Sequence, residues 1–334
     1  MLLGIKKKPT SPEKLTVRDF YNRRNKIVII RDSRGIGDIL NCRMLFSNFK
    51  KLLPDVDITF ACARDYLDLL KNHPFLDRAI DCNTVDKNEY AASYDISSCC
   101  IKYESSIMGK NVKHRAEIWA DHCGVPLVDH DMHLPIISKE EMAKGYLRVK
   151  QLRSSATTRE NKNGPSVLFS PIAHEQQRSL TMEHIRGTIK LLRQKGLFVY
   201  AINHLKTNLY SELDVPLLIG NNYTDWMSCI HAADYVVTVD TSNFHYAGAI
   251  KKPMTGIFTH VDGKLRGKFY DFVLVQKHRD NGNWPCGPCY NYFYCTHEDC
   301  KDPTSQTDLR PCLTQLTLDE IDEGIEKMLK KWSI

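Results

Sequence analysis

Residues 235–250 read YVVTVDTSNFHYAGAI, a run that joins a buried strand to the start of a helix. The first five residues are almost all apolar, which is typical of a central strand in a parallel sheet. The polar run Asp240-Thr241-Ser242-Asn243-Phe244-His245 then leads into small residues. A helix that begins there presents backbone N–H groups, which suit a phosphate or diphosphate. The same polar side chains are also ordinary helix N-caps, so the turn alone allows both interpretations.

A second turn of this kind lies near the start of the chain. The apolar run over residues 26–31 leads through Asp32-Ser33-Arg34-Gly35-Ile36-Gly37-Asp38 into a helical pattern. Strands and helices alternate after both turns, which predicts repeated βα units and parallel sheets.

The length of 334 residues exceeds what a single core usually holds, so two domains are expected. We predict an N-terminal domain over residues 1–153, a polar linker over 154–165 and a C-terminal domain over 166–334 with a terminal helix over 318–332. The predicted fold class is α/β, with two doubly wound, Rossmann-like domains. Open parallel sheets bind ligands at the carboxyl ends of their strands, so the cleft between the two domains is the expected active site.

Composition narrows the class of protein. With 42% hydrophobic and 26% charged residues, the chain resembles a soluble globular protein, and no run approaches the ~20 apolar residues of a membrane span. The N-terminus places its apolar residues before Lys6-Lys7-Lys8, the wrong order for a secretory signal, so we expect a cytoplasmic protein. The net charge of +6 favours anionic ligands.

Twelve cysteines without a secretory signal indicate thiols or a metal site rather than a disulfide scaffold. A cysteine-rich loop is predicted over residues 286–312. Four thiolates at this spacing can hold one structural Zn²⁺, and the alternative is that they pack as small apolar side chains. The candidate zinc ligands are Cys286, Cys289, Cys295 and Cys300, with Cys312 following.

These features resemble the heptosyltransferase family of bacterial sugar transferases, glycosyltransferase family 9, over nearly the whole chain. The matching N-terminal elements are Gly37-Asp38, the run over 54–60 and Asn72-His73-Pro74-Phe75-Leu76-Asp77. The matching C-terminal elements are Val239-Asp240-Thr241, His245, Gly256-Ile257-Phe258 and the cysteines at 286, 289 and 312. The resemblance implies the two-domain GT-B fold and glycosyl transfer from a nucleotide sugar.

The sequence also departs from the family pattern. A proline that often closes the first motif is missing from Asn41-Cys42-Arg43, and Ser242 replaces a glycine. The expected basic-plus-tryptophan motif is reduced to Arg178-Ser179-Leu180. These departures bear on which donor sugar and which acceptor the site takes more than on the fold.

Glycosyl transfer needs a general base for the acceptor hydroxyl, and positive charge or N–H dipoles for the departing diphosphate. By resemblance and by position, Asp38 is the candidate base; the alternative is that it caps a helix beginning at Ile39. Gly35 and Gly37 would let the backbone approach a substrate closely, although a tight turn also explains glycines.

The candidate donor-binding residues follow from the second turn and from the basic side chains near it. Asp240 is better suited to ordering the turn or to a sugar hydroxyl than to phosphate, since two negative charges repel. Arg178 is the first choice for the cation that faces the leaving group, with Lys264 and Arg266 as further candidates. The predicted donor-binding residues are Arg178, Asp240, Thr241, Ser242, Asn243 and His245.

No DxD-like acidic pair stands where a bridging Mg²⁺ is expected, so we predict transfer that requires no metal or other cofactor beyond the nucleotide-sugar co-substrate. Direct in-line displacement with an external base would invert the anomeric centre, as the family resemblance also implies. The acceptor is either a lipid-linked saccharide, with the enzyme peripheral to the inner membrane face, or nucleic acid such as a hydroxylated base in viral DNA. A sugar-nucleotide epimerase of the same fold and a non-catalytic zinc-bound adaptor are the other hypotheses. A dehydrogenase is disfavoured because neither turn contains GxGxxG.

Overall fold

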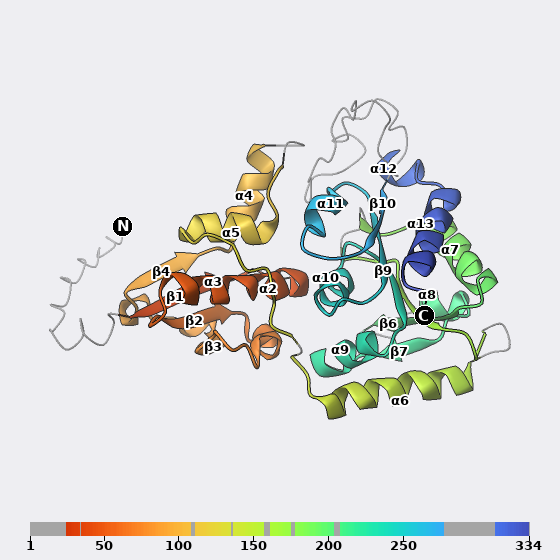
Figure 1. Cartoon of the computed structure of the whole chain (residues 1–334), viewed down its shortest axis with the longest axis horizontal. Coiled ribbons are helices and arrows are strands. Elements are labelled where there is room, and N and C mark those ends of the chain that lie inside the picture. The colour runs from red at the N-terminus through yellow and green to blue at the C-terminus, as the bar shows by residue number, and fades with distance from the viewer. Residues whose placement is uncertain are drawn as a thin grey trace, which may run out of the picture.

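The computed structural model of the protein describes residues 25–33, 35–107, 111–134, 136–156, 161–174, 178–203, 208–276 and 311–333. These residues form two parallel sheets that lie side by side along the long axis of the molecule, each covered by helices (Figure 1). The α/β fold class expected from the sequence is therefore confirmed.

The N-terminal sheet has four parallel strands in the order β3-β2-β1-β4. Its central strand β1 is buried at every position after the first, because helices and neighbouring strands cover it. The strands are β1 Lys26–Arg31, β2 Asp57–Cys62, β3 Arg78–Asp81 and β4 Ala92–Asp95. The helices of this half are α2 Ile36–Cys42, α3 Met44–Leu52, the 3₁₀ helices η1 Arg64–Leu70, η2 Cys82–Thr84 and η3 Lys87–Glu89, α4 Cys99–Ser106 and α5 Arg115–Cys123.

The C-terminal sheet has six parallel strands in the order β10-β9-β8-β5-β6-β7. The switch in strand order lies between β5 and β8, which are both buried along their whole length. The strands are β5 Ser166–Ser170, β6 Phe198–Asn203, β7 Leu217–Ile219, β8 Tyr235–Val239, β9 Met254–Phe258 and β10 Val273–Gln276. The helices are α7 Met182–Gln194, α8 Asn208–Glu212, α9 Tyr223–His231, α10 Ser242–Ala249, α11 Gly263–Arg266, α12 Pro311–Thr314 and α13 Leu318–Lys331.

Helix α6, Lys139–Ser155, precedes the predicted linker yet lies along α9 of the C-terminal half (Figure 1). A capping box fixes its start, because the Ser138 side chain accepts from Glu141 N–H and the Glu141 side chain accepts from Ser138 N–H. Gly145 allows the close approach: a Cβ there would lie 2.1 Å from the carbonyl oxygen of Ser228. Small size at this position thus fixes how the connecting helix crosses to the second sheet.

The helix boundaries at the two turns decide what the polar residues can do. Helix α2 begins at Ile36 with Gly35 as its N-cap, so Asp38 is the third helical residue and does not cap the helix. The alternative reading of Asp38 as an N-cap is therefore wrong. Thr241 is the N-cap residue of α10, and no side chain caps that helix. Among the described helices, none combines the length and the apolar composition needed to cross a bilayer.

Candidate active site between the two domains

Helix α2 of the N-terminal half and helix α10 of the C-terminal half pack against each other where the two sheets face (Figure 1). Gly37 makes this contact possible, since a Cβ there would lie 2.5 Å from Cδ2 of His245. Polar contacts complete it: Asn41 Nδ2 lies 3.2 Å from His245 Nδ1, and the Tyr270 hydroxyl donates to Asn41 Oδ1 at 2.8 Å. The two strand-to-helix turns therefore meet in one interface.

Asp38 is clamped by two arginines of its own domain. Arg31 Nη2 donates to Asp38 Oδ2 at 2.6 Å, and Arg115 Nη1 donates to both carboxylate oxygens at 3.0 and 2.9 Å. Burial alone raises the pKa of Asp38, but the charges of Arg115, Arg31 and Arg266 outweigh it and hold this pKa well below its usual range. Asp38 is thus ionised at neutral pH and oriented by its partners.

Asp240 is the counterpart on the C-terminal side, at the end of β8. Arg178 Nη1 donates to the Asp240 backbone carbonyl at 3.0 Å and lies 3.3 Å from Oδ2, and His245 Nε2 lies 3.7 Å from Oδ1. Burial again raises the pKa of this carboxyl, while Arg178, His245 and Arg266 bring it well below the usual range. Arg178 therefore has an anionic partner beside the start of α10.

Glu104 on α4 connects these two carboxylates through arginines. It is 1% exposed and accepts from Arg115 at both oxygens, from Nε at 3.0 Å and from Nη2 at 2.8 Å. Its Oε1 also lies 3.4 Å from Nη2 of Arg266, which belongs to α11 of the other domain. Arg266 Nε in turn lies 3.9 Å from Asp240 Oδ2.

These contacts make one series of alternating charges across the interface, which we call the arginine–carboxylate chain. In order, its members are Arg31, Asp38, Arg115, Glu104, Arg266, Asp240 and Arg178. Four guanidiniums face three carboxylates, so the ionised chain carries a net charge of +1. The chain is largely buried, carries a net positive charge and lies beside the N-terminus of α10, which has no side-chain cap. It therefore favours an anionic ligand.

The remaining predicted donor residues lie around the same turn. The Thr241 hydroxyl contacts that of Thr238 at 3.1 Å, and Ser242 is the first residue of α10. Asn243 is used internally: its Nδ2 donates to Ser170 Oγ at 2.7 Å, and its Oδ1 accepts from Trp226 Nε1 at 2.6 Å. Its amide therefore ties α10 to β5 and α9. Of the further basic candidates, Arg266 belongs to the chain of charges whereas Lys264 is exposed.

Gly35 shapes the other turn. Its φ of 133° is a conformation that residues with a Cβ rarely adopt, and its N–H donates to the Tyr66 hydroxyl at 3.4 Å. A Cβ at this position would also lie 3.4 Å from Asp38 Oδ2. That is an ordinary contact distance, so glycine is needed here for the backbone conformation.

The predicted zinc ligands Cys286, Cys289, Cys295 and Cys300 lie outside the described residues, as does most of the loop over 286–312. Cys312 is described, buried and without a disulfide. Within the described ranges, no cluster of three or more His, Cys, Asp or Glu side chains is arranged to hold a metal ion.

Reasoning from the sequence missed Arg31, Arg115 and Glu104. The sequence does contain an indication of Arg31, because an arginine at the end of a buried strand needs an anionic partner near the ligand-binding edge of the sheet. Glu104 and Arg115 lie on α4 and α5, where the periodicity is weak, and only their packing reveals them.

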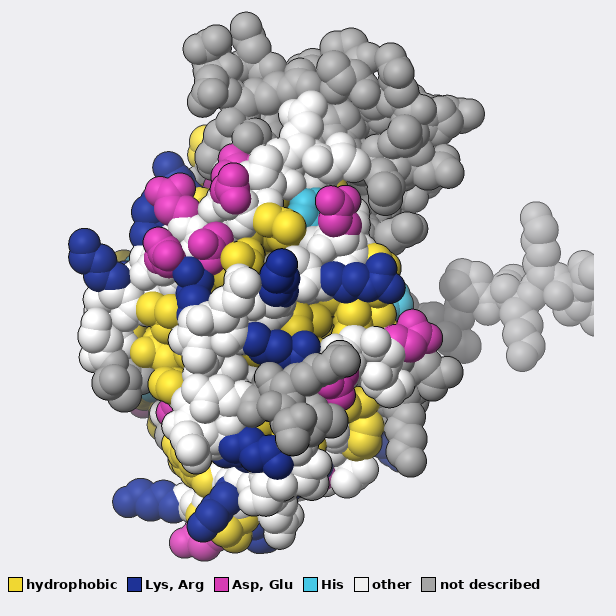
Figure 2. Space-filling model, turned by 90° about the vertical axis from the view of Figure 1, so that its right-hand side faces the viewer, with side chains coloured by type: hydrophobic (Ala, Val, Ile, Leu, Met, Phe, Trp, Pro, Cys, Tyr) yellow, Lys and Arg dark blue, Asp and Glu magenta, His cyan; other side chains and the backbone are white. Residues whose placement is uncertain are grey.

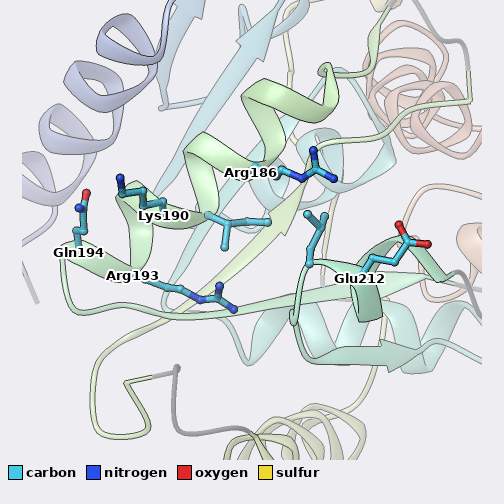
Figure 3. Close-up of a pocket in the computed structure, with 7 residues that line it drawn as sticks. Arg186, Lys190, Arg193, Gln194 and Glu212 are labelled. Carbon is cyan, nitrogen blue, oxygen red and sulfur yellow. The ribbon is translucent and has the colours of Figure 1, made fainter.

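A separate hollow lies on the outer side of the C-terminal domain. Its volume is about 590 Å³, and Arg186, Lys190 and Arg193 of α7 line it together with Glu212 of α8, with Lys190 pointing away from Glu212 (Figure 3). Lys and Arg side chains also gather across the middle of the molecular face shown in Figure 2. None of the predicted site residues lines this hollow.

Comparison with solved structures identifies the fold. A family 9 glycosyltransferase from Veillonella parvula has a TM-score of 0.64 at 10% identity, with 93% of this chain and 99% of that one covered. ADP-heptose LPS heptosyltransferase II from E. coli has a TM-score of 0.58 at 12% identity, covering 92% and 99%. E. coli heptosyltransferase WaaC with ADP-2-deoxy-2-fluoro heptose has a TM-score of 0.52 at 14% identity, covering 90% and 99%.

The chain thus has the two-domain α/β fold of these glycosyltransferases over nearly its full described length. No protein-family model matches the sequence, and no curated protein sequence is significantly similar to it. At such low identity the likeness establishes the fold, and function has to be argued from the site.

Proposed function

We propose that the protein is a glycosyltransferase that moves a sugar from a nucleotide-diphosphate donor to an acceptor hydroxyl. The observation that carries this proposal is the meeting of the Asp38 turn and the uncapped start of α10 in one interdomain interface, joined by the arginine–carboxylate chain. One side supplies an oriented carboxylate, and the other supplies N–H dipoles and guanidiniums for a leaving diphosphate.

The roles follow from this arrangement. Asp38 accepts the acceptor proton, while the α10 N-terminus with Arg178 and Arg266 receives the charge that grows on the diphosphate. Asp240 orients Arg178 and does not touch the phosphate. Attack from the Asp38 side, opposite the leaving group, inverts the anomeric centre, and the arginines supply the positive charge that a metal ion supplies in other transferases.

The donor is the first point to test. Solved structures of this fold include WaaC with ADP-2-deoxy-2-fluoro heptose, so ADP-heptose heads a panel of ADP-, UDP-, GDP- and CMP-linked sugars. A ligand bound only by the folded protein must raise its melting temperature. A panel in which no nucleotide sugar raises the melting temperature would count against the proposal.

A variant separates chemistry from binding. Asp38→Asn keeps the shape of the side chain but cannot accept a proton, so it is expected to keep donor affinity and lose transfer. If donor turnover occurs without any acceptor, the protein is an epimerase or hydrolase of the same fold. If Asp38→Asn transfers sugar at the wild-type rate, Asp38 is not the base.

The acceptor is expected to bind against the N-terminal domain, which carries Asp38. The two acceptors considered are a lipid-linked saccharide at the inner membrane face and nucleic acid. Nucleic-acid binding must weaken steeply with salt because it releases counterions. Titration of a DNA duplex and of a lipid-linked saccharide mimic at low and high salt distinguishes the two.

A further inference from the structure

Glu104 is a buried carboxylate for which the proposed chemistry has no direct use. It lies on α4 of the N-terminal domain, is 1% exposed, and contacts arginines of both domains. A buried charge is stable only when it is well paired. The role of Glu104 therefore depends on the arginines that it pairs with.

The two arginine contacts of Glu104 differ in quality. Arg115, from the same domain, forms a two-pronged pair at 3.0 and 2.8 Å, the strong geometry for this ion pair. Arg266, from the other domain, approaches Glu104 only to 3.4 Å and Asp240 only to 3.9 Å. Of the two arginines, Arg115 thus holds Glu104 more closely than Arg266 does.

Arg266 also lies where a donor diphosphate would arrive. It contacts Asp240, the residue directly before the N-cap of α10, and that helix start has no side-chain cap. A diphosphate carries more negative charge than a carboxylate, and a guanidinium forms the same paired hydrogen bonds with phosphate as with carboxylate. It would therefore compete with Glu104 for Arg266.

We propose that Glu104 is a positioning residue that holds Arg266 in place of the donor diphosphate, and that donor binding transfers Arg266 from Glu104 to the phosphate. This inference rests on the proposed function, because it assumes that the diphosphate binds at α10. After the exchange, Glu104 pairs with Arg115 alone.

The exchange links donor binding to the candidate base. Burial raises the pKa of Asp38, whereas Arg115, Arg31 and Arg266 lower it. A carboxylate held so strongly is a weak proton acceptor, since a base works best when its pKa is near the working pH. When the diphosphate neutralises Arg266 and Glu104 draws Arg115, the hold on Asp38 loosens. Asp38 thus becomes a better base only when a donor is present.

The first test measures binding of inorganic pyrophosphate by calorimetry. Glu104→Gln removes the carboxylate that competes with pyrophosphate for Arg266. We expect the variant to bind pyrophosphate about five- to tenfold more tightly than the wild type. A residue with a purely structural role would weaken binding when replaced, so tighter binding is the distinguishing result.

A matched control removes a different ion pair from the same interface. Glu117 on α5 pairs with Lys268 of the other domain at 2.6 Å, at a partly exposed position, and it is not a member of the arginine–carboxylate chain. Glu117→Gln keeps the capping box of α5, because glutamine can serve there. The affinity of Glu117→Gln for pyrophosphate is expected to stay within about twofold of wild type, since solvent largely screens a partly exposed pair.

A second variant keeps the charge. Glu104→Asp is one methylene shorter, so it can stay with Arg115 but cannot also reach Arg266, and it is expected to tighten binding by a smaller factor. Circular dichroism verifies that each variant is folded. If Glu104→Gln and Glu104→Asp are folded but bind pyrophosphate only as tightly as the wild type, or more weakly, the exchange does not occur.

The outcome separates this inference from the proposed function. Tighter pyrophosphate binding by Glu104→Gln, without turnover of any nucleotide sugar by the wild type, would support the exchange and refute the transferase. Sugar transfer by the wild type together with unchanged pyrophosphate binding by the variants would support the transferase and refute the exchange.

Discussion

Replacing Gly37 with alanine has two effects of opposite sign on the free energy of unfolding. Gly37 lies in the first turn of α2, where alanine favours the helix by up to about 1 kcal/mol. A Cβ there would lie 2.5 Å from Cδ2 of His245 and 3.3 Å from its Cγ and Nε2. The ring or the helix must then shift by about 1 Å, and such overpacking costs about 1–3 kcal/mol. We therefore expect a net loss of about 1 kcal/mol.

A double-mutant cycle isolates the clash. Urea unfolding is measured for wild type, Gly37→Ala, His245→Ala and the double variant. Without the His245 ring the three atoms nearest to the added methyl group are gone, so Gly37→Ala should stabilise that background by about 0.5–1 kcal/mol. The sign of the effect thus reverses between the two backgrounds. The same sign and size in both would show that the contact between α2 and α10 is not as described.

Three further predictions test other parts of the structure. Arg43→Met should cost about 3–5 kcal/mol in urea unfolding, because the buried guanidinium donates to four backbone carbonyls that methionine leaves unsatisfied; a loss below about 1 kcal/mol would contradict this. Burial, with nearby positive charge, lowers the pKa of His73 to about 3 and of His231 to about 4, so both stay neutral when folded and gain protons below about pH 6.5 when unfolded. Stability should therefore fall as the pH drops from 6.5 to 4.5, by up to about 1.4 kcal/mol per pH unit for each histidine, and a flat profile would argue against their burial. Asn243→Ala should cost about 1–3 kcal/mol by leaving the Trp226 indole N–H without its acceptor, whereas Asn243→Asp, which keeps that acceptor, should recover part of the loss in the same assay.

Several features of the fold could be predicted from local sequence. The buried strands β1, β5 and β8 are largely apolar runs, because helices cover both faces of a parallel sheet. The amphipathic pattern of the last segment predicted α13, whose start is fixed by a capping box at Thr317 and Glu320. Such signals depend only on residues near one another in the chain.

The break between α2 and α3 shows where local reasoning fell short. The sequence indicated only that the usual proline is absent from residues 41–43. In the structure, Arg43 lies at this break and donates to carbonyls of Leu69, Lys71, Met132 and His133. Those acceptors lie far along the chain, so the sequence could not identify Arg43 as the residue that ties these loops together.

By itself, the sequence determined two βα turns, the parallel sheets that they imply and the candidate residues within each turn, because strand burial, helix starts and glycine conformations are set by neighbouring residues. Only the tertiary structure decided that Asp38 and Asp240 lie in one interface and that Glu104 and Arg266 join them across it. The physical reason is that a charge in a buried interface must be paired there, and its partner can come from any segment that the fold brings within a few ångströms.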